Sequence, residues 1–286
     1  MTIEGEIKQF GIQRGAKLVG IASVADINKY APQGHRPDDI LIGAKSVIVC
    51  AGFPYTHGAV RCPDYQAFQS NYDFVRIRGG ITLALAKFIE SEYGYYALAD
   101  VPPPVGLYPS LSFKLCGEMA GLGTRSMAGG IILNNELGFI NLAVCVTTMP
   151  LEADGPLGEP VCPDSSCVER WEKQRTVPCL ETCPECLSGE FENGEIKWMR
   201  FDRRICSTRP QNHSPVAFAR LLLEASEEPN PGMRRSMILG SFSRNTIQAI
   251  ASGAVVGQCG ECVRNCPIVM RGRQLASNHV RSQSGS

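Results

Sequence analysis

The residues best suited to chemistry in this chain are its cysteines, which are numerous and unevenly placed. The sequence holds 13 cysteines, and nine of them fall between positions 162 and 266. The sharpest motif is Cys259-x2-Cys262-x3-Cys266-Pro267, and Cys179-x3-Cys183-Pro184 repeats its second half upstream. Short loops of this kind bring thiolates to the corners of one iron–sulfur cube, and a cysteine before proline often ligates the other cluster of a pair. The late cysteines therefore predict two cubane 4Fe–4S clusters.

The number of thiolates constrains how the two clusters are bound. Two four-iron clusters need about eight thiolates, so one of the nine late cysteines is spare. By the crossed ferredoxin pattern, we predict that the first cluster is bound by Cys162, Cys167, Cys179 and Cys266. The second cluster is predicted to be bound by Cys183, Cys206, Cys259 and Cys262. Cys186 is then left over, although it could replace one of these ligands.

A structural zinc site is the main alternative for the same cysteines. Cys183-x2-Cys186 and Cys259-x2-Cys262 are two knuckles of the kind found in a zinc ribbon. A zinc site would leave three neighbouring cysteines unused and would give no reason for the two Cys-Pro pairs, so we favour the clusters. The two cases differ in colour, because a cluster protein is brown and absorbs near ~400 nm whereas a zinc protein is colourless.

The first half of the chain alternates helix and strand patterns, which favours an α/β layered architecture. Helices are expected over residues 3–14, 64–93 (with a break at Gly79-Gly80) and 112–120. Strands are expected over residues 17–23, 46–52, 95–99 and 139–148. Cys50 and Cys145 fall within the apolar strands and are expected to be buried small hydrophobes. Cys62 and Cys116 belong to no motif and are given no role.

The composition changes at the Gly- and Pro-punctuated stretch 151–160, which indicates a boundary or a long connection. Beyond it cysteines, prolines and arginines dominate, and helices over 215–226 and 243–252 are the only clear elements. Small cluster-binding modules have this character because metal ligation replaces part of the core. We therefore predict an α/β domain over 1–155, a cluster domain over 156–275 and a flexible tail over 276–286.

Charge and hydropathy narrow the choice of partners and compartment. Lys plus Arg equals Asp plus Glu at 28 each, which argues against a dedicated nucleic-acid binder. Basic stretches at 200–204 and 264–273 are interpreted as solvated faces that offset cluster charge. There is no apolar run of the ~20 residues needed to cross a bilayer and no signal-peptide pattern. We expect a cytoplasmic protein without a membrane partner, where many cysteines indicate metal or redox chemistry.

Three features together resemble the epoxyqueuosine reductase and reductive dehalogenase superfamily. The first is the cysteine order, in which a group ending at Cys183-Pro184 is followed by a cysteine after two arginines, Cys206, and then by the C-terminal C-x2-C-x3-C-P motif. The second is the glycine-rich turn Gly121-Leu122-Gly123 after a helix. The third is the segment 133–154, which resembles the strand leading from the family's cofactor domain to its ferredoxin domain. The resemblance covers about residues 95–270.

The resemblance implies a nitroreductase-like, corrinoid-binding α/β layer followed by a ferredoxin-like domain with two clusters. Members bind cobalamin or a related corrinoid, which the clusters reduce so that it can carry out a two-electron reduction of the substrate. The resemblance places Gly121, Leu122 and Gly123 at the corrinoid. It makes Asp100, a loose match to the family's Asp-Ser/Thr-Ala-Pro segment, or Tyr108 the proton donor. Asp100 is equally well explained as a turn residue at the end of a strand.

Two departures from the family pattern matter for the site and the substrate. The spacing of Cys162, Cys167 and Cys179 is x4 and x11, where the family has x2 and x2, so an insertion over 168–178 must loop out. The sequence also ends about 20 residues after Cys266, whereas epoxyqueuosine reductases continue into a helical-repeat domain that helps to hold tRNA. We therefore expect no nucleic-acid substrate.

The cysteine motifs predict an iron–sulfur protein, and the resemblance implies a corrinoid-dependent, anaerobic oxidoreductase that reduces an unknown small substrate. Its electrons would come from a low-potential donor of the ferredoxin or flavodoxin type. The alternative is an electron-transfer or reductive-activation protein that serves a partner corrinoid enzyme and has no substrate of its own. A deep pocket with polar groups near a cluster would favour the enzyme, and a flat face would favour the carrier.

Overall fold

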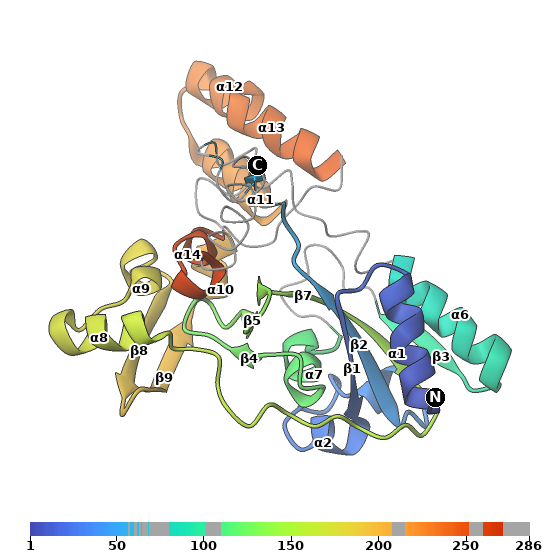
Figure 1. Ribbon diagram of the computed structural model, residues 1–286. Coiled ribbons are helices and arrows are strands. Elements are labelled where there is room, and N and C mark those ends of the chain that lie inside the picture. The colour runs from blue at the N-terminus through green and yellow to red at the C-terminus, as the bar shows by residue number, and fades with distance from the viewer. Residues whose placement is uncertain are drawn as a thin grey trace, which may run out of the picture.

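The computed structural model describes residues 1–56, 58–59, 62, 64, 68, 80–100, 110–207, 215–251 and 260–270, without the side chains of residues 100, 249 and 251. Figure 1 shows a sheet with its helices, a smaller unit beside it and a group of three helices above. No helix in these ranges combines the length and apolar character that a bilayer-spanning segment requires.

A four-stranded sheet organises the first half of the chain. Its strands are β1 (Leu18–Ser23), β2 (Ser46–Gly52), β7 (Asn141–Thr147) and β3 (Ala97–Asp100), in the order β1-β2-β7-β3. Each neighbouring pair is antiparallel. The two central strands, β2 and β7, are buried along their whole length, which explains why they read as unbroken apolar runs. The predicted mixture of helices and strands is confirmed, with an antiparallel sheet at its centre.

Helices cover both faces of this sheet because successive side chains of a strand point to opposite faces. Ile48 packs under α1 (Ile3–Gln13) and α6 (Ile81–Tyr93), where Ile7 and Leu85 complete a buried cluster. Val47 and Val49 face the opposite layer, which contains α2 (Val24–Asn28), α3 (Pro37–Ile40) and α7 (Phe113–Met119). Figure 1 shows α1 and α6 on one side of the sheet and α7 on the other.

The connection to the second half of the chain runs beside the edge strand β1. The Asp154 carboxylate accepts a hydrogen bond from the Ile21 N–H at 2.7 Å and pairs with the Lys8 ammonium. The Asp154 N–H donates in turn to the Ile21 carbonyl at 2.9 Å. The stretch 151–160 is thus fastened to the sheet as an extended segment, and the predicted domain limits stay a prediction.

The smaller unit contains more regular structure than the sequence predicts. It consists of α8 (Ser165–Gln174), α9 (Pro178–Thr182), the hairpin β8 (Leu187–Glu192)–β9 (Glu195–Phe201), α10 (Arg203–Ser207) and α14 (Glu261–Arg264). A three-stranded sheet of β4 (Thr124–Arg125), β5 (Ile132–Asn134) and β6 (Gly138–Phe139) lies between this unit and the large sheet. The expectation that 168–178 loops out is wrong, because most of that segment is the helix α8. The Asp164 side chain caps α8 by accepting from the Ser166 N–H at 3.0 Å.

The three remaining helices form a unit of their own. They are α11 (Pro215–Glu227), α12 (Pro231–Leu239) and α13 (Ser241–Ala251), and each packs against the other two. The first and last agree with the predicted helices 215–226 and 243–252 within two residues, and α12 was not expected.

Candidate functional site

Eight of the nine late cysteines lie within the described residues, and all eight are buried in one core. The ninth, Cys259, lies outside the described residues. Apolar side chains fill the space between the thiols, among them Val177, Leu187 and Phe191. The smaller unit is therefore built around sulfur, as the cysteine spacing predicts.

Four of these thiols line one small cavity of about 20 Å³. Cys162 lies in the segment before α8, Cys167 in the first turn of α8, Cys179 in α9 and Cys266 directly after α14. The other lining residues are mostly apolar and include Phe191. These are the four cysteines predicted to bind the first cluster, and the fold brings them together from positions that are distant in sequence. Their role as ligands stays a prediction.

Burial keeps these thiols protonated in the absence of metal. It raises the pKa of Cys162 to about 12 and that of Cys167 to about 11, and it raises the pKa of Cys179 and Cys266 as well. Repulsion between neighbouring thiolates raises the Cys179 pKa further. Thiolates are the form that binds metal, so loading this cavity would release protons. The four-thiol donor set and its mostly apolar setting fit the ligand chemistry of an iron–sulfur cluster.

The other described cysteines, Cys183, Cys186, Cys206 and Cys262, belong to the same core. Cys183 follows α9, and the hairpin β8–β9 returns the chain so that the Asp202 N–H donates to the Cys186 carbonyl at 2.8 Å. The Cys206 N–H then donates to the Asp202 carbonyl at 3.1 Å. Helix α14, which carries Cys262, packs against α9. Cys186 is as deeply buried as the predicted ligands, so its place as the spare cysteine stays a prediction.

A mononuclear metal site is not evident in the part of the chain that the structure describes. No three His, Cys, Asp or Glu side chains there are arranged to hold one ion. A zinc ion would need sulfurs within about 2.3 Å of one point, whereas a cube binds each thiolate at a different iron. Of the zinc knuckle Cys259-x2-Cys262, only Cys262 lies within the described residues.

The glycine turn after α7 is shaped by close backbone packing. Gly121 has φ +67°, and a Cβ there would lie 2.6 Å from the Gly155 carbonyl oxygen. A Cβ on Gly123 would lie 2.3 Å from the Leu133 carbonyl oxygen. Leu122 is buried in the core. The fold itself therefore requires glycine at both positions, and the corrinoid contacts predicted for this turn stay a prediction.

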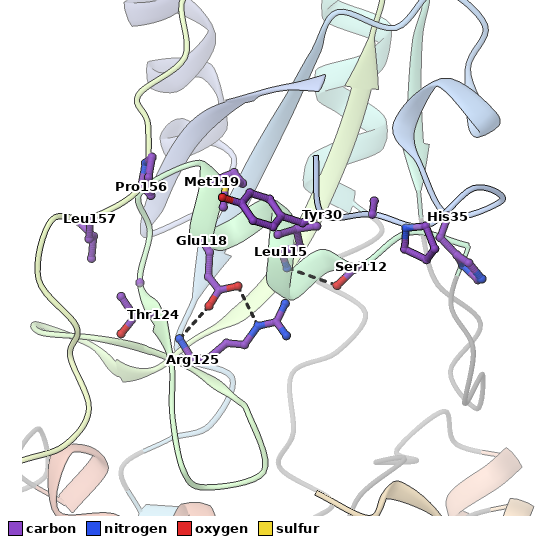
Figure 2. Close-up of a pocket in the computed structure, with 13 residues that line it drawn as sticks. Tyr30, His35, Ser112, Leu115, Glu118, Met119, Thr124, Arg125, Pro156 and Leu157 are labelled. Carbon is purple, nitrogen blue, oxygen red and sulfur yellow. Dashed lines mark hydrogen bonds and ion pairs between the residues drawn. The ribbon is translucent and has the colours of Figure 1, made fainter. Parts of the chain in front are cut away.

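A pocket of about 610 Å³ opens beside this turn (Figure 2), and its wall includes Gly123. The sides are apolar and aromatic, with Tyr30 and Leu157 among the lining residues. Figure 2 shows the Glu118 carboxylate turned toward Arg125, whose Nε donates to it at 2.8 Å. Apolar walls with a few fixed polar groups are typical of small-molecule sites.

The pocket and the cysteine cavity share one short stretch of chain. Thr124 and Arg125 of β4 line the pocket, and the next residues, Ser126 and Met127, line the cavity. The Thr124 hydroxyl also accepts from the Val161 N–H at 2.8 Å, next to the first cavity cysteine. Consecutive residues of a strand are about 3.3 Å apart, so the two linings meet within a few ångströms along the backbone.

The loop after β4 also packs against the hairpin β8–β9, and glycines make the contact close. A Cβ on Gly189 of β8 would lie 2.5 Å from the Met127 sulfur and 2.7 Å from the Trp198 carbonyl oxygen. A Cβ on Gly129 would lie 3.5 Å from the Phe201 ring. The hairpin thus sits directly on the loop that lines the cysteine cavity.

Lys114 is a largely buried cation at this junction that the sequence did not single out. Its ammonium donates to the Gly129 carbonyl at 3.3 Å. Burial lowers the pKa of Lys114 to about 8, and the charges of Arg203 and Arg125 lower it further, while Cys262 and Glu118 oppose the change. A single lysine in a helix carries no sequence signal for such a position, which depends on the packing of the two units.

The predicted proton donors lie at or beyond the edge of the described structure. Asp100 is the last residue of β3 and pairs in register with Val144, which agrees with an aspartate at a strand end. Tyr108 lies outside the described residues. The roles of both stay predictions. Of the early cysteines, Cys50 and Cys145 are fully buried as expected.

Solved structures share this fold. The epoxyqueuosine reductase of Bacillus subtilis is 16% identical, with 93% of this chain and 65% of that chain covered at a TM-score of 0.52. A selenomethionine-labelled epoxyqueuosine reductase is 17% identical, with 94% of this chain and 66% of that chain covered at a TM-score of 0.52. A reductive dehalogenase structure that suggests a mechanism for B12-dependent dehalogenation is 19% identical. The match covers 91% of this chain and 37% of that chain at a TM-score of 0.49. No family model and no curated protein matches the chain.

The two reductases at a TM-score of 0.52 confirm the predicted resemblance at the level of the fold. The chain spans about two thirds of the length of these two reductases. It spans about half the length of another epoxyqueuosine reductase, which was solved with an epoxyqueuosine-modified tRNA stem loop. The tRNA belongs to that structure. The expectation of no nucleic-acid partner for this chain is therefore not confirmed and stays a prediction.

Proposed function

We propose that this chain is a corrinoid-dependent iron–sulfur reductase of a small substrate. The observation that carries the proposal is that Cys162, Cys167, Cys179 and Cys266 line one small cavity in the core of the smaller unit. The fold brings these four thiols together from four separate segments of the chain, whereas Cys50 and Cys145 each fill the core of the four-stranded sheet as small apolar side chains. When bound, the clusters would supply low-potential electrons and a corrinoid would supply the two-electron chemistry.

The protein's own contribution is to hold and shield these groups. The first cluster would be held by the four cavity thiols, and the second by Cys183, Cys206, Cys259 and Cys262. Phe191 and Ile268 line the cavity with apolar surface that keeps water away from it. A dry, low-dielectric setting is one of the features by which proteins tune cluster potentials.

The pocket beside Gly123 supports an enzyme over a simple electron carrier. It is a concave site of about 610 Å³ with a fixed Glu118–Arg125 pair, and its lining meets that of the cysteine cavity in β4. We propose that it receives part of the corrinoid or the substrate. A carrier would need no such pocket next to its cluster.

Metal and corrinoid analysis of anaerobically purified protein tests the proposal. We expect about eight irons and matching sulfide per chain, and about four irons in Cys179→Ser. The matched control is Cys145→Ser, which alters a buried thiol in the sheet core and should keep about eight. Fewer than about four irons in the unaltered chain, or mainly zinc, would overturn the cluster proposal.

Cobalamin binding under reducing conditions tests the second half of the proposal. The iron-loaded chain should retain cobalamin on gel filtration, and Leu157→Arg, which places a large side chain at the pocket wall, should retain less. If the chain holds both clusters and binds no corrinoid, the reductase proposal fails and the electron-carrier alternative takes its place.

A further inference from the structure

A second groove lies on the outer side of the smaller unit, and both tryptophans of the chain line it. The sequence has two tryptophans, Trp171 on α8 and Trp198 on β9. They border a groove of about 700 Å³ together with Leu180 of α9 and Leu187 of β8. Figure 1 shows α8, α9, β8 and β9 on the side of the molecule away from the four-stranded sheet.

The groove and the cysteine cavity are separated by one aromatic side chain. Phe191 lines both of them and is 6% exposed. The Trp171 ring meets the Phe191 ring edge to face, with centroids 5.5 Å apart. A molecule in the groove would therefore lie one ring away from the space enclosed by the four thiols.

Trp171 also carries an unused hydrogen-bond donor. Its indole N–H is buried and has no acceptor within the described part of the chain. Tryptophan N–H groups usually find a partner when they are buried, so this unpaired donor carries a cost in the free protein.

The charges around the groove are mixed. Lys197 pairs with Glu192 at 2.9 Å, and Glu190 and Arg175 also border the groove. With two cations and two carboxylates, the groove has no net positive charge that would attract the acidic face of a protein donor. It suits a largely neutral, planar ring that stacks on exposed aromatic surface, such as that of Trp198, which is 44% exposed.

We propose that this groove binds a planar aromatic electron donor of the flavin class and is the entry point for electrons. The inference rests on the proposed function, because it gives the cysteine cavity a source of electrons. One reduced flavin would release two electrons and two protons. Each of the two clusters would take one electron, the protons would pass to solvent, and the oxidised flavin would leave the groove.

Flavin binding to the iron-loaded, anaerobic chain tests the inference without reference to any substrate. Riboflavin and flavin mononucleotide are the probes, measured by equilibrium dialysis and by loss of flavin fluorescence on stacking. Trp198→Ala should weaken binding by about 5- to 150-fold, which corresponds to the range of about 1–3 kcal/mol found for a base stacked on an aromatic side chain. Trp171→Phe, which keeps a ring and removes the N–H, should weaken it less. Tyr30→Ala, at the other pocket, is the matched control and should bind flavin normally.

A kinetic readout links the groove to the cavity. Reduced flavin mononucleotide should bleach the cluster absorbance near ~400 nm, and Trp198→Ala should slow this reduction while its iron content stays normal. If the chain holds its iron yet binds neither flavin, or if the alanine variant binds flavin as tightly as the unaltered chain, the inference fails and the proposed function stands. Absence of iron would instead overturn the proposed function. Reduction by a ferredoxin alone, slowed by Trp198→Ala, would replace the flavin with a protein donor.

Discussion

Removing the charge of Lys114 should stabilise the protein in a pH-dependent way. Lys114→Met keeps the length of the side chain and deletes the ammonium that burial, Arg203 and Arg125 disfavour. Because the pKa of Lys114 in the folded chain is lowered to about 8 from its ordinary value of 10.5, the unfolded chain binds this proton more tightly. The loss of folding free energy caused by the buried ammonium is complete below pH 8. It declines as pH rises from about 8 to 10.5 and is absent above that range.

The size of the effect follows from the two pKa values. A difference of one pKa unit corresponds to about 1.4 kcal/mol, so the change from 10.5 to about 8 corresponds to about 3 kcal/mol at pH 7. The substitution also removes the 3.3 Å hydrogen bond to the Gly129 carbonyl, worth about 1 kcal/mol. Lys114→Met should therefore raise the free energy of unfolding by about 2 kcal/mol at pH 7 and should give no gain at pH 10.5.

Urea unfolding of the metal-free chain at pH 7 and pH 10.5, with reductant and without oxygen, measures this difference. The thiols titrate in both proteins, so their contribution cancels in the comparison. Lys87→Met, at an exposed lysine of α6, is the matched control and should change stability little at either pH. In the iron-loaded chain the gain should be smaller, since negative cluster charge near Cys262 would favour the ammonium. An equal gain at both pH values, or a loss at pH 7, would refute the reasoning.

Three further outcomes are expected. Asp154→Ala should lower the free energy of unfolding by about 1–3 kcal/mol, measured by chemical denaturation, because its carboxylate fastens the connecting segment to β1 through a charged hydrogen bond. Cys186→Ser should keep about eight irons while Cys183→Ser falls to about four, and the reverse result would make Cys186 the ligand. Gly189→Ala should cost about 1–3 kcal/mol through its close contacts with the hairpin and cavity loop, whereas Gly158→Ala, where a Cβ meets nothing within 4 Å, should be neutral.

The first half of the fold could be predicted because its apolar patterns are local. The strand expected over 46–52 is β2 with the same limits, and the helix expected over 112–120 is α7, which begins where the Ser112 side chain accepts from the Leu115 N–H. Each pattern reflects which residues one element buries. The order of the strands does not follow from such patterns, since β3 pairs with β7 through contacts between residues about 50 positions apart.

The smaller unit was predicted less well, although one local signal was present. Asn193 and Gly194 both have positive φ, at 52° and 80°, and they join β8 to β9. Asn-Gly between alternating side chains is the strongest short-range hairpin signal, so the hairpin could have been found from the sequence. It matters for the site because it carries Phe191 and Trp198. The position of Lys114, by contrast, depends on how two distant units pack and has no local signal.

Three hollows within the described part of the chain are arranged in an order that would suit directed electron flow. Phe191 lies between the tryptophan groove and the cysteine cavity. The lining of that cavity meets the lining of the pocket beside Gly123 where the backbone runs from Arg125 to Ser126. Phe191 belongs to both of the first two linings, and Arg125 and Ser126 are consecutive residues. A donor in the groove and an acceptor in the pocket would each contact the cavity wall without competing for the same surface. If the proposed function holds, this separation would allow the chain to be reduced while its substrate stays bound, which a single shared opening would not permit.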